Sequence, residues 1–206
     1  MLKIWGRPNS VNVQKVMWCV AELGLDHERI DAGMQFGLND QDWYRAMNPN
    51  GLIPVIDDGG LVLWESNAIV RYLAATYGAG TLCPAAAAER ATADQWMDWQ
   101  ATTLGVPMGP VFMGLIRTPA AQRDMGAIDA ATVDCNRLFG LLDQHLDGRT
   151  YMLGDNLTMA DIPIGAMTYR WYGLDVPHAD HPNLRAWYDR LATRPTFQEH
   201  VMIPLS

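Results

Sequence analysis

The sequence predicts a mixed α/β half followed by an all-α half. Strand and helix signals alternate through residues 1–80, and from Thr81 onward the strand signals disappear. Gly, Ala, Thr and Pro gather at residues 77–85, as expected of a linker. We therefore predict two domains, residues 1–79 and residues 86–206.

The first half carries four strand signals. A short apolar run at residues 2–5 ends in a Gly-Arg-Pro turn, and helically spaced Val and Met residues follow as far as Gly24. We expect a second strand at residues 27–30, then loop and short helix at 33–46. Two further apolar runs, 54–56 and 61–64, flank an Asp-Asp-Gly-Gly hairpin signal. The resulting order is βαβ followed by αββα, with Ser66 as the N-cap of the last helix.

The second half is predicted to be helical throughout. Residues 85–116 and 120–146 form long helical stretches, the first interrupted near Gly105-Val106-Pro107. Thr158-Met159-Ala160-Asp161 has the pattern of a capping box. An amphipathic helix over residues 184–191 stops before Pro195.

Composition excludes several classes of function. The chain of 206 residues has a net charge of −8, and no stretch clusters Lys and Arg, so we expect no nucleic-acid partner. No segment approaches the roughly 20 apolar residues of a membrane span. The N-terminus also lacks the apolar core of a signal peptide, so we expect a cytoplasmic protein.

The cysteines and histidines predict neither a disulfide framework nor a metal site. Cys19, Cys83 and Cys135 lie far apart and form no C-x-x-C pair. The five histidines have no ligand-like spacing. Any thiol chemistry is therefore expected to use a thiol from outside the protein.

One candidate site lies where the first strand enters the first helix, at Asn9-Ser10-Val11-Asn12. A helix N-terminus offers free N–H groups and a partial positive charge to an anion. A thiol with an ordinary pKa of about 8.5 would ionise more readily there if a hydroxyl donated to its sulfur. The alternative is that Ser10 only caps the helix.

Two further motifs suit a peptide ligand. Pro54 begins a strand, and a cis Ile53–Pro54 bond would turn the backbone of Ile53 outward; the alternative is an ordinary trans proline. Glu65 and Ser66 begin the third helix, where they would hold an amino group and a carboxylate. The alternative is an N-cap with an acidic neighbour.

In chain order these motifs resemble the glutathione site of the glutathione transferases. The motifs are residues 10–16 (SVNVQKV), 48–54 (NPNGLIP) and 63–73 (LWESNAIVRYL), and the resemblance continues through residues 158–161 and 183–195. The chain is most similar to bacterial enzymes of the glutathione transferase B type. The resemblance implies a thioredoxin-like N-terminal domain, a helical C-terminal domain, a homodimer and glutathione as co-substrate, with no metal.

The resemblance also implies roles for single residues. Ser10 contacts the glutathione sulfur, although Asn9, Asn12 or the backbone remain alternatives. Ile53 presents its backbone to the cysteinyl unit beside cis-Pro54, and Glu65 and Ser66 hold the γ-glutamyl end. Asp161 matches a helix-capping aspartate that serves folding.

The resemblance places the second substrate between the loop after the first strand and the first long helix of the second half. Candidates there are Arg7, Pro8, Val106, Met108, Phe112, Met113 and Arg117. An apolar wall with cations suits a small electrophile that carries a carboxylate, and the resemblance points to haloacetates. The alternative is that the arginines are solvated or interact with a helix dipole, and that the apolar residues belong to the core.

We therefore expect a glutathione S-transferase that conjugates the glutathione thiolate to a small electrophile. One alternative is a glutathione-dependent disulfide reductase, although the helix start lacks the cysteine of glutaredoxin-like enzymes. A second alternative is a non-enzymatic ligand-binding or docking protein on the same fold.

Overall fold

Four short strands form one mixed sheet in the computed structural model, which describes residues 1–206. They are β1 (Leu2–Trp5), β2 (His27–Ile30), β3 (Val55–Asp58) and β4 (Leu61–Trp64), in the order β2-β1-β3-β4. Strand β1 pairs parallel with β2 and antiparallel with β3, and β3 and β4 form the hairpin. The predicted order of parallel strands first and an antiparallel hairpin second is confirmed.

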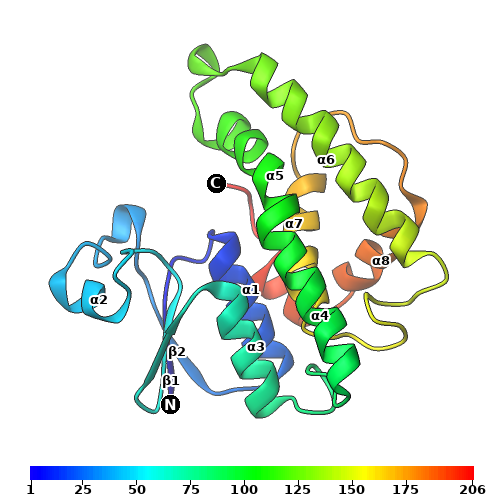
Figure 1. The fold of residues 1–206 in the computed structure, drawn as a ribbon. Coiled ribbons are helices and arrows are strands. Elements are labelled where there is room, and N and C mark those ends of the chain that lie inside the picture. The colour runs from blue at the N-terminus through cyan, green and yellow to red at the C-terminus, as the bar shows by residue number, and fades with distance from the viewer.

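Helices cover both faces of this sheet (Figure 1). They are α1 (Val11–Glu22) and α3 (Ser66–Tyr77) on one face and the short α2 (Asp42–Met47) on the other. Because neighbouring strand residues point to opposite faces, Ile4 and Ile56 join the large core beneath α1 and α3. Trp5 and Val55 instead pack against Tyr44 of α2.

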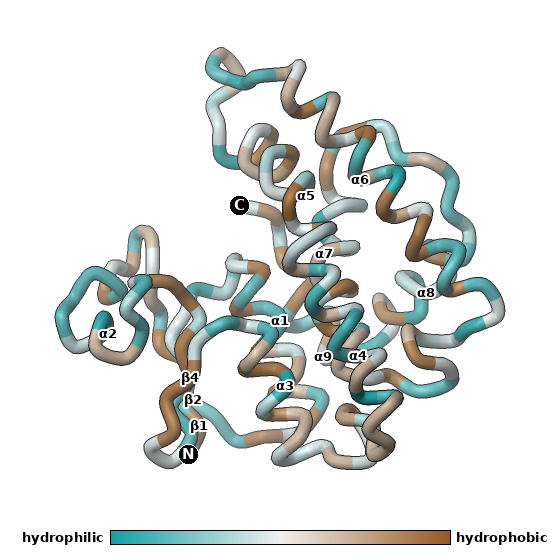
Figure 2. Tube along the Cα trace, in the orientation of Figure 1, coloured by the Kyte–Doolittle hydropathy of each residue, from teal (hydrophilic) through white to brown (hydrophobic).

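The second half consists of helices, as predicted. They are α4 (Ala87–Trp99), α5 (Gly105–Phe112), α6 (Met125–Leu146), α7 (Asp161–Tyr172), α8 (Pro182–Ala192) and α9 (Pro195–His200). A single 3-10 turn occurs in this half at Ala120–Gln122, and another occurs in the first half at Met34–Phe36. Figure 2 shows an apolar strand β4, whereas polar and apolar residues alternate along α6. No helix combines the length and apolarity needed to cross a membrane.

The expected interruption near Gly105-Val106-Pro107 is a π-helical turn and not a break in the helix. The helix continues from α4 through a π-helical turn at Gln100–Leu104 into α5, and a second π-helical turn follows at Met113–Arg117. A proline inside a regular α-helix lacks one donor and clashes with the carbonyl four residues before it. The wider π-helical turn just before Pro107 relieves that conflict, so the helix changes its pitch and does not break.

The two halves share one hydrophobic core, which contains residues of α1, α3 and all the helices from α4 to α9. Trp18 of α1 is fully buried, and its ring lies 4.7 Å from that of Phe197 in α9. The connection between α3 and α4 spans residues 78–86. The division into domains at 1–79 and 86–206 stays a prediction, because the core does not separate there.

Asp161 begins α7 and is completely buried. Its carboxylate accepts hydrogen bonds from the Thr158 N–H at 2.9 Å, the Met152 N–H at 2.9 Å and the Trp187 indole at 2.9 Å. The Thr158 hydroxyl also donates to this carboxylate, at 3.2 Å. Only the carboxylate half of the predicted capping box is therefore formed, and Asp161 additionally joins α7 to α8.

Candidate functional site

A cavity of about 520 Å³ lies between the two halves, lined by residues from α1, the start of α3, α5 and α7. It brings together most of the predicted site residues: Arg7, Ser10, Asn12, Glu65, Ser66, Val106, Met108, Phe112, Met113 and Arg117. A smaller adjoining cavity of about 80 Å³ is lined by Ile53, Pro54, Asn12, Glu65 and Ser66, among others. Pro8 is exposed and lines neither cavity.

Ser10 occupies the N-cap position of α1 and is 8% exposed. Its backbone is extended, with φ −87°, but its side chain makes no capping hydrogen bond. The alternative in which Ser10 serves only as a side-chain cap therefore does not describe this geometry. Ser10 lines the cavity at the α1 N-terminus, whose free N–H groups stabilise an anion.

The two neighbouring asparagines differ in their availability. The Asn9 amide donates to Ser206 Oγ at 2.6 Å and accepts from Arg7 at 2.6 Å, and Asn9 does not line the cavity. Asn12 lines the cavity, and its Oδ1 accepts from Lys15 at 3.1 Å and from Ser66 at 3.2 Å. The amide NH₂ of Asn12 makes no hydrogen bond to the protein, so Asn12 remains a possible donor to a ligand.

The backbone of Ile53 is unpaired. Its N–H and C=O make no hydrogen bond within the chain, and the Ile53–Pro54 peptide bond is cis. The preceding carbonyl, that of Leu52, accepts from the Tyr44 hydroxyl at 2.9 Å and from the Asn48 amide at 2.8 Å. The loop is thus fixed just before a residue that has a free backbone donor and acceptor.

Glu65 and Ser66 lie between the two cavities and line both. Ser66 is the first helical residue of α3, and Glu65 occupies the N-cap position, so the predicted N-cap lies one residue too late. The left-handed φ of +70° at Glu65 excludes this residue from the helix, which begins at Ser66. Such backbone strain in a non-glycine residue gathers at ligand sites. The Glu65 carboxylate is exposed and makes no hydrogen bond.

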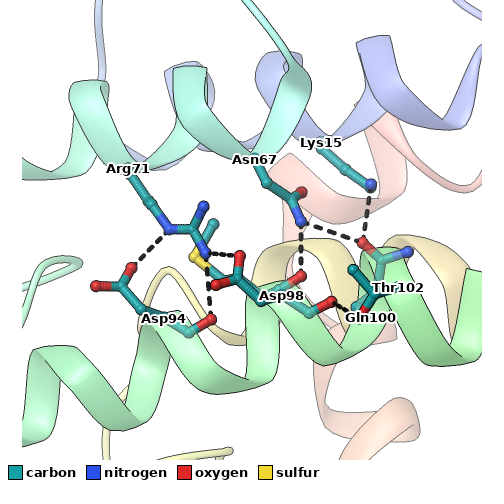
Figure 3. Close-up of polar contacts among 8 residues, drawn as sticks. Lys15, Asn67, Arg71, Asp94, Asp98, Gln100 and Thr102 are labelled. Atoms are coloured by element: carbon teal, nitrogen blue, oxygen red, sulfur yellow. Dashed lines mark hydrogen bonds and ion pairs between the residues drawn. The ribbon is translucent and has the colours of Figure 1, made fainter.

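Lys15 is a site residue that was not predicted from the sequence. It is 3% exposed, lines the cavity, and donates to Gln100 Oε1 at 2.9 Å. Figure 3 shows Lys15 from α1 and Asn67 from α3 reaching the same Gln100 amide. Burial, with a smaller effect from Arg170, lowers the pKa of Lys15 to about 7. The signal in the sequence was a lysine among the apolar residues of a helix face.

Three arginines converge on the other end of the cavity. Arg7, Arg117 and Arg170 all line it. The guanidinium of Arg170 lies 4.0 Å from the centre of the Phe112 ring, and the guanidinium of Arg117 lies 5.6 Å from the same point. None of the three forms an ion pair with an acidic side chain, and the Nε atom of each is buried without a partner. The interpretation of Arg7 as a solvated turn residue and of Arg117 as only a helix-end cation is incomplete, since both are half-buried here.

Arg170 was missed because it lies in the last turn of a largely apolar helix, far along the chain from the other site residues. It is 8% exposed and donates to the Asn9 carbonyl at 3.1 Å. Burial and the nearby charges of Arg117 and Arg7 lower its pKa to about 9, and burial and Arg117 likewise lower the pKa of Arg7. An anion in the cavity would relieve this repulsion.

The apolar wall has a buried and an exposed part. Met108 and Phe112 are 2% and 5% exposed and belong to the core as well as to the cavity wall. Val106 and Met113 line the cavity but are exposed, which places them at its mouth. Met108 and Phe112 therefore serve both as core residues and as part of the cavity wall.

No protein thiol meets this cavity, because Cys19, Cys83 and Cys135 are all buried and none lines it. Burial also raises the pKa of Cys19 and, to about 12, that of Cys135. No three His, Cys, Asp or Glu side chains are grouped as ligands of a metal ion. The absence of a metal stays a prediction.

Comparison with known proteins gives concordant matches. Residues 1–75 match the family described as glutathione S-transferase, N-terminal domain, and residues 104–195 match glutathione S-transferase, C-terminal domain. The chain is 45% identical to glutathione S-transferase GstB of Escherichia coli (strain K12), covering 100% of both chains. It is 33% identical to glutathione S-transferase 3 of Zea mays, covering 99% of this chain and 95% of that one.

A solved structure matches equally well. It is the theta class glutathione S-transferase from the citrus canker pathogen Xanthomonas axonopodis pv. citri with glutathione bound. The TM-score is 0.96 at 46% sequence identity, and the match covers 100% of this chain and 99% of that one.

Proposed function

Because this chain belongs to the glutathione S-transferase family, we propose that it joins the glutathione thiolate to a small anionic electrophile of the haloacetate class. The family establishes a transferase with a two-part fold of this kind. The nature of the electrophile is our inference from the cavity. It depends on the three arginines that line the cavity and form no ion pair with an acidic side chain. Of these, Arg117 donates to the main-chain oxygen of Ser206 at 2.6 Å.

Glutathione would occupy the end of the site formed by the first half. Its backbone would pair with the free N–H and C=O of Ile53, beside Pro54. Its γ-glutamyl amino group and carboxylate would meet Glu65 and Ser66 at the N-terminus of α3. The sulfur would then lie near the N-terminus of α1, with Ser10 as its donor. The unused hydrogen-bonding capacity of these groups supports this arrangement.

The reaction follows from these positions. The thiolate sulfur attacks the methylene carbon of the haloacetate, a C–S bond forms, the carbon–halogen bond breaks, and halide leaves with the bonding electrons. The thiol proton is lost to solvent as the thiolate forms. Ser10 stabilises the thiolate, and the arginines hold the carboxylate so that the carbon lies in line with the sulfur. Met108 and Phe112 would pack against the methylene group and the halogen.

We also propose that the protein acts as a homodimer in the cytoplasm and detoxifies reactive halogenated acids. Membership of the family supports this assignment. Light scattering during size-exclusion chromatography should give twice the chain mass of 22.9 kDa. A mass of 22.9 kDa would contradict the dimer.

The electrophile class is tested with two substrates that share a leaving group. Iodoacetate and iodoacetamide both offer an iodomethyl carbon, but only iodoacetate carries a charge. The enzymatic kcat/KM for each is divided by the uncatalysed second-order rate constant with glutathione. We expect this ratio to be at least about tenfold larger for iodoacetate, as one charge-assisted contact would give. An equal or larger ratio for iodoacetamide would contradict the anionic assignment.

A further inference from the structure

Lys15 is a buried cation that has no anion beside it. Its three hydrogen-bond partners are neutral: Gln100 Oε1 at 2.9 Å, Asn12 Oδ1 at 3.1 Å and Ser66 Oγ at 3.5 Å. Burying a charge costs free energy unless an opposite charge compensates it. In its protonated form Lys15 is therefore an uncompensated positive charge on the wall of the ligand cavity.

The charged groups around Lys15 do not supply the missing anion. Arg170 approaches from α7 and disfavours the charged lysine. Glu65, at the start of α3, favours the charged lysine, but its carboxylate is exposed and not bonded to the lysine. In Figure 3 the acidic residues of α4, Asp94 and Asp98, are instead paired with Arg71.

Ser66 places a ligand carboxylate within reach of this lysine. An oxygen bonded to the Ser66 hydroxyl lies about 2.8 Å from Oγ. Since Oγ is 3.5 Å from the lysine Nζ, that oxygen lies within roughly 6 Å of the ammonium group, where opposite charges strongly favour ionisation. The Ser66 hydroxyl is able to turn toward a ligand, because Asn12 Oδ1 keeps its second donor, Lys15.

We propose that Lys15 is the counter-cation for the α-carboxylate of the γ-glutamyl group, so that bound glutathione and the proton on Lys15 stabilise one another. The inference rests on the proposed binding of glutathione at Glu65 and Ser66. It adds a residue of α1 that lines the cavity to a subsite otherwise formed by the start of α3. Lys15 is a binding residue in this arrangement and takes no part in the transfer of the thiol.

This arrangement couples glutathione binding to proton uptake. The pKa of Lys15 in the free protein is about 7, so above neutral pH much of the lysine is uncharged. A bound carboxylate raises this pKa, and the protein therefore takes up a fraction of a proton as the ligand binds. Affinity should be highest below pH 7 and should fall as the pH rises from 7 to the pKa of the bound state.

The test uses S-methylglutathione, whose sulfur has no proton to lose. Titration calorimetry at pH 8 in two buffers of different ionisation enthalpy measures proton uptake by the wild type and by Lys15→Met. We expect uptake of up to one proton in the wild type, and in the variant about tenfold weaker binding with no uptake from this site. Lys3→Met, the same change at an exposed lysine of β1, should match the wild type.

A second ligand separates binding from a purely structural role. The S-methyl derivative of 4-aminobutyryl-cysteinyl-glycine keeps the amino group but lacks the α-carboxylate. Wild type and Lys15→Met should bind it with equal affinity. If the variant loses the same affinity for both ligands, Lys15 only holds α1 against Gln100 and the inference is overturned.

The remaining outcomes also distinguish the two proposals. Wild-type binding of S-methylglutathione without proton uptake would overturn the role of Lys15 and leave the glutathione site intact, and this result needs no variant. Failure of the wild type to bind S-methylglutathione would overturn the proposed function and this inference together. Thermal unfolding of Lys15→Met shows whether the variant retains the wild-type fold.

Discussion

The guanidinium of Arg170 lies 4.0 Å from the centre of the Phe112 ring, so that a buried arginine of α7 stacks on the apolar wall formed by α5. This contact fixes the plane of the guanidinium, and the hydrogen bond to the Asn9 carbonyl uses one of its nitrogens. Its Nε is buried and has no hydrogen-bond partner. A planar donor held in this way is suited to a carboxylate.

Replacing Arg170 by Met should therefore reduce activity toward anionic electrophiles selectively. We expect kcat/KM for iodoacetate to fall about tenfold or more, because a charge-assisted contact is lost, while that for iodoacetamide changes by less than about threefold. Steady-state kinetics with both substrates check this. Arg137→Met, at a 63% exposed side chain of α6, is the control and should change neither value. Equal losses for both substrates would mean that Arg170 only positions the loop at Asn9.

The Ser10 hydroxyl should lower the pKa of the bound thiol. The ultraviolet absorbance of the thiolate, followed against pH in the enzyme–glutathione complex, should give a pKa below the ordinary value of about 8.5 in the wild type. In Ser10→Ala we expect it to rise by about one unit, equivalent to ~1.4 kcal/mol, with a roughly tenfold lower rate at pH 7.

Asn12→Ala is the matched variant for this measurement, because Asn12 also lines the cavity. We expect it to leave the thiol pKa nearly unchanged. A shift in Asn12→Ala but not in Ser10→Ala would transfer the role to the asparagine. Equal pKa values in all three proteins would assign it to the backbone N–H groups of α1.

The order of the elements was predictable from local signals. The Asp-Gly turn, the Pro and Gly breaks and the apolar periodicity all act within a few residues, so strands β1 and β2 have the predicted bounds. The π-helical turns around α5 were not predictable in this way. The first of them, at Gln100–Leu104, relieves the conflict between Pro107 and the helix, and the periodicity of apolar residues does not reveal such a local change of helix geometry.

The residues of the site fall into the same two groups. Ser10, Ile53 and Glu65 lie in short motifs next to turns, where a few neighbouring residues suggest a role. Lys15 and Arg170 instead lie inside buried helix faces of different halves. What gives them a role is the shared cavity and the absence of acidic partners. Both are properties of the tertiary structure, so they could not be predicted from the sequence of one protein.

Asp161 should be essential to stability. It is completely buried and receives four hydrogen bonds from donors in three segments. Asp161→Ala would leave these donors unsatisfied, and we expect the free energy of unfolding to fall by at least about 3 kcal/mol. Urea unfolding followed by circular dichroism measures this. Asp155→Ala, at an exposed position of the preceding loop, should change it by less than about 0.5 kcal/mol. A similarly small decrease in the free energy of unfolding for both variants would contradict the structural role of Asp161.

Glu22, at the end of α1, should make the stability of the fold depend on pH in the acid range. Its carboxylate receives hydrogen bonds from the Arg194 side chain, the Trp18 indole and the Thr196 hydroxyl. Burial raises the pKa of Glu22, but these hydrogen bonds together outweigh burial and leave its pKa below the ordinary value. The carboxylate thus joins α1 to the C-terminal helices, and its charged form stabilises the folded state.

The sign of the pH dependence follows from this lowered pKa. The stabilisation is complete above the unfolded-state pKa of about 4.3 and is lost as the pH falls through the lower pKa of the folded state. Glu22→Gln should lower the free energy of unfolding by about 2 kcal/mol at pH 7, and the difference from the wild type should shrink below pH ~4. Urea unfolding from pH 7 to pH 3 measures both proteins, with Glu28→Gln on the exposed side of β2 as the control. A difference that stays constant over this range would mean that Glu22 acts through packing, because only a contribution of its charge disappears on protonation.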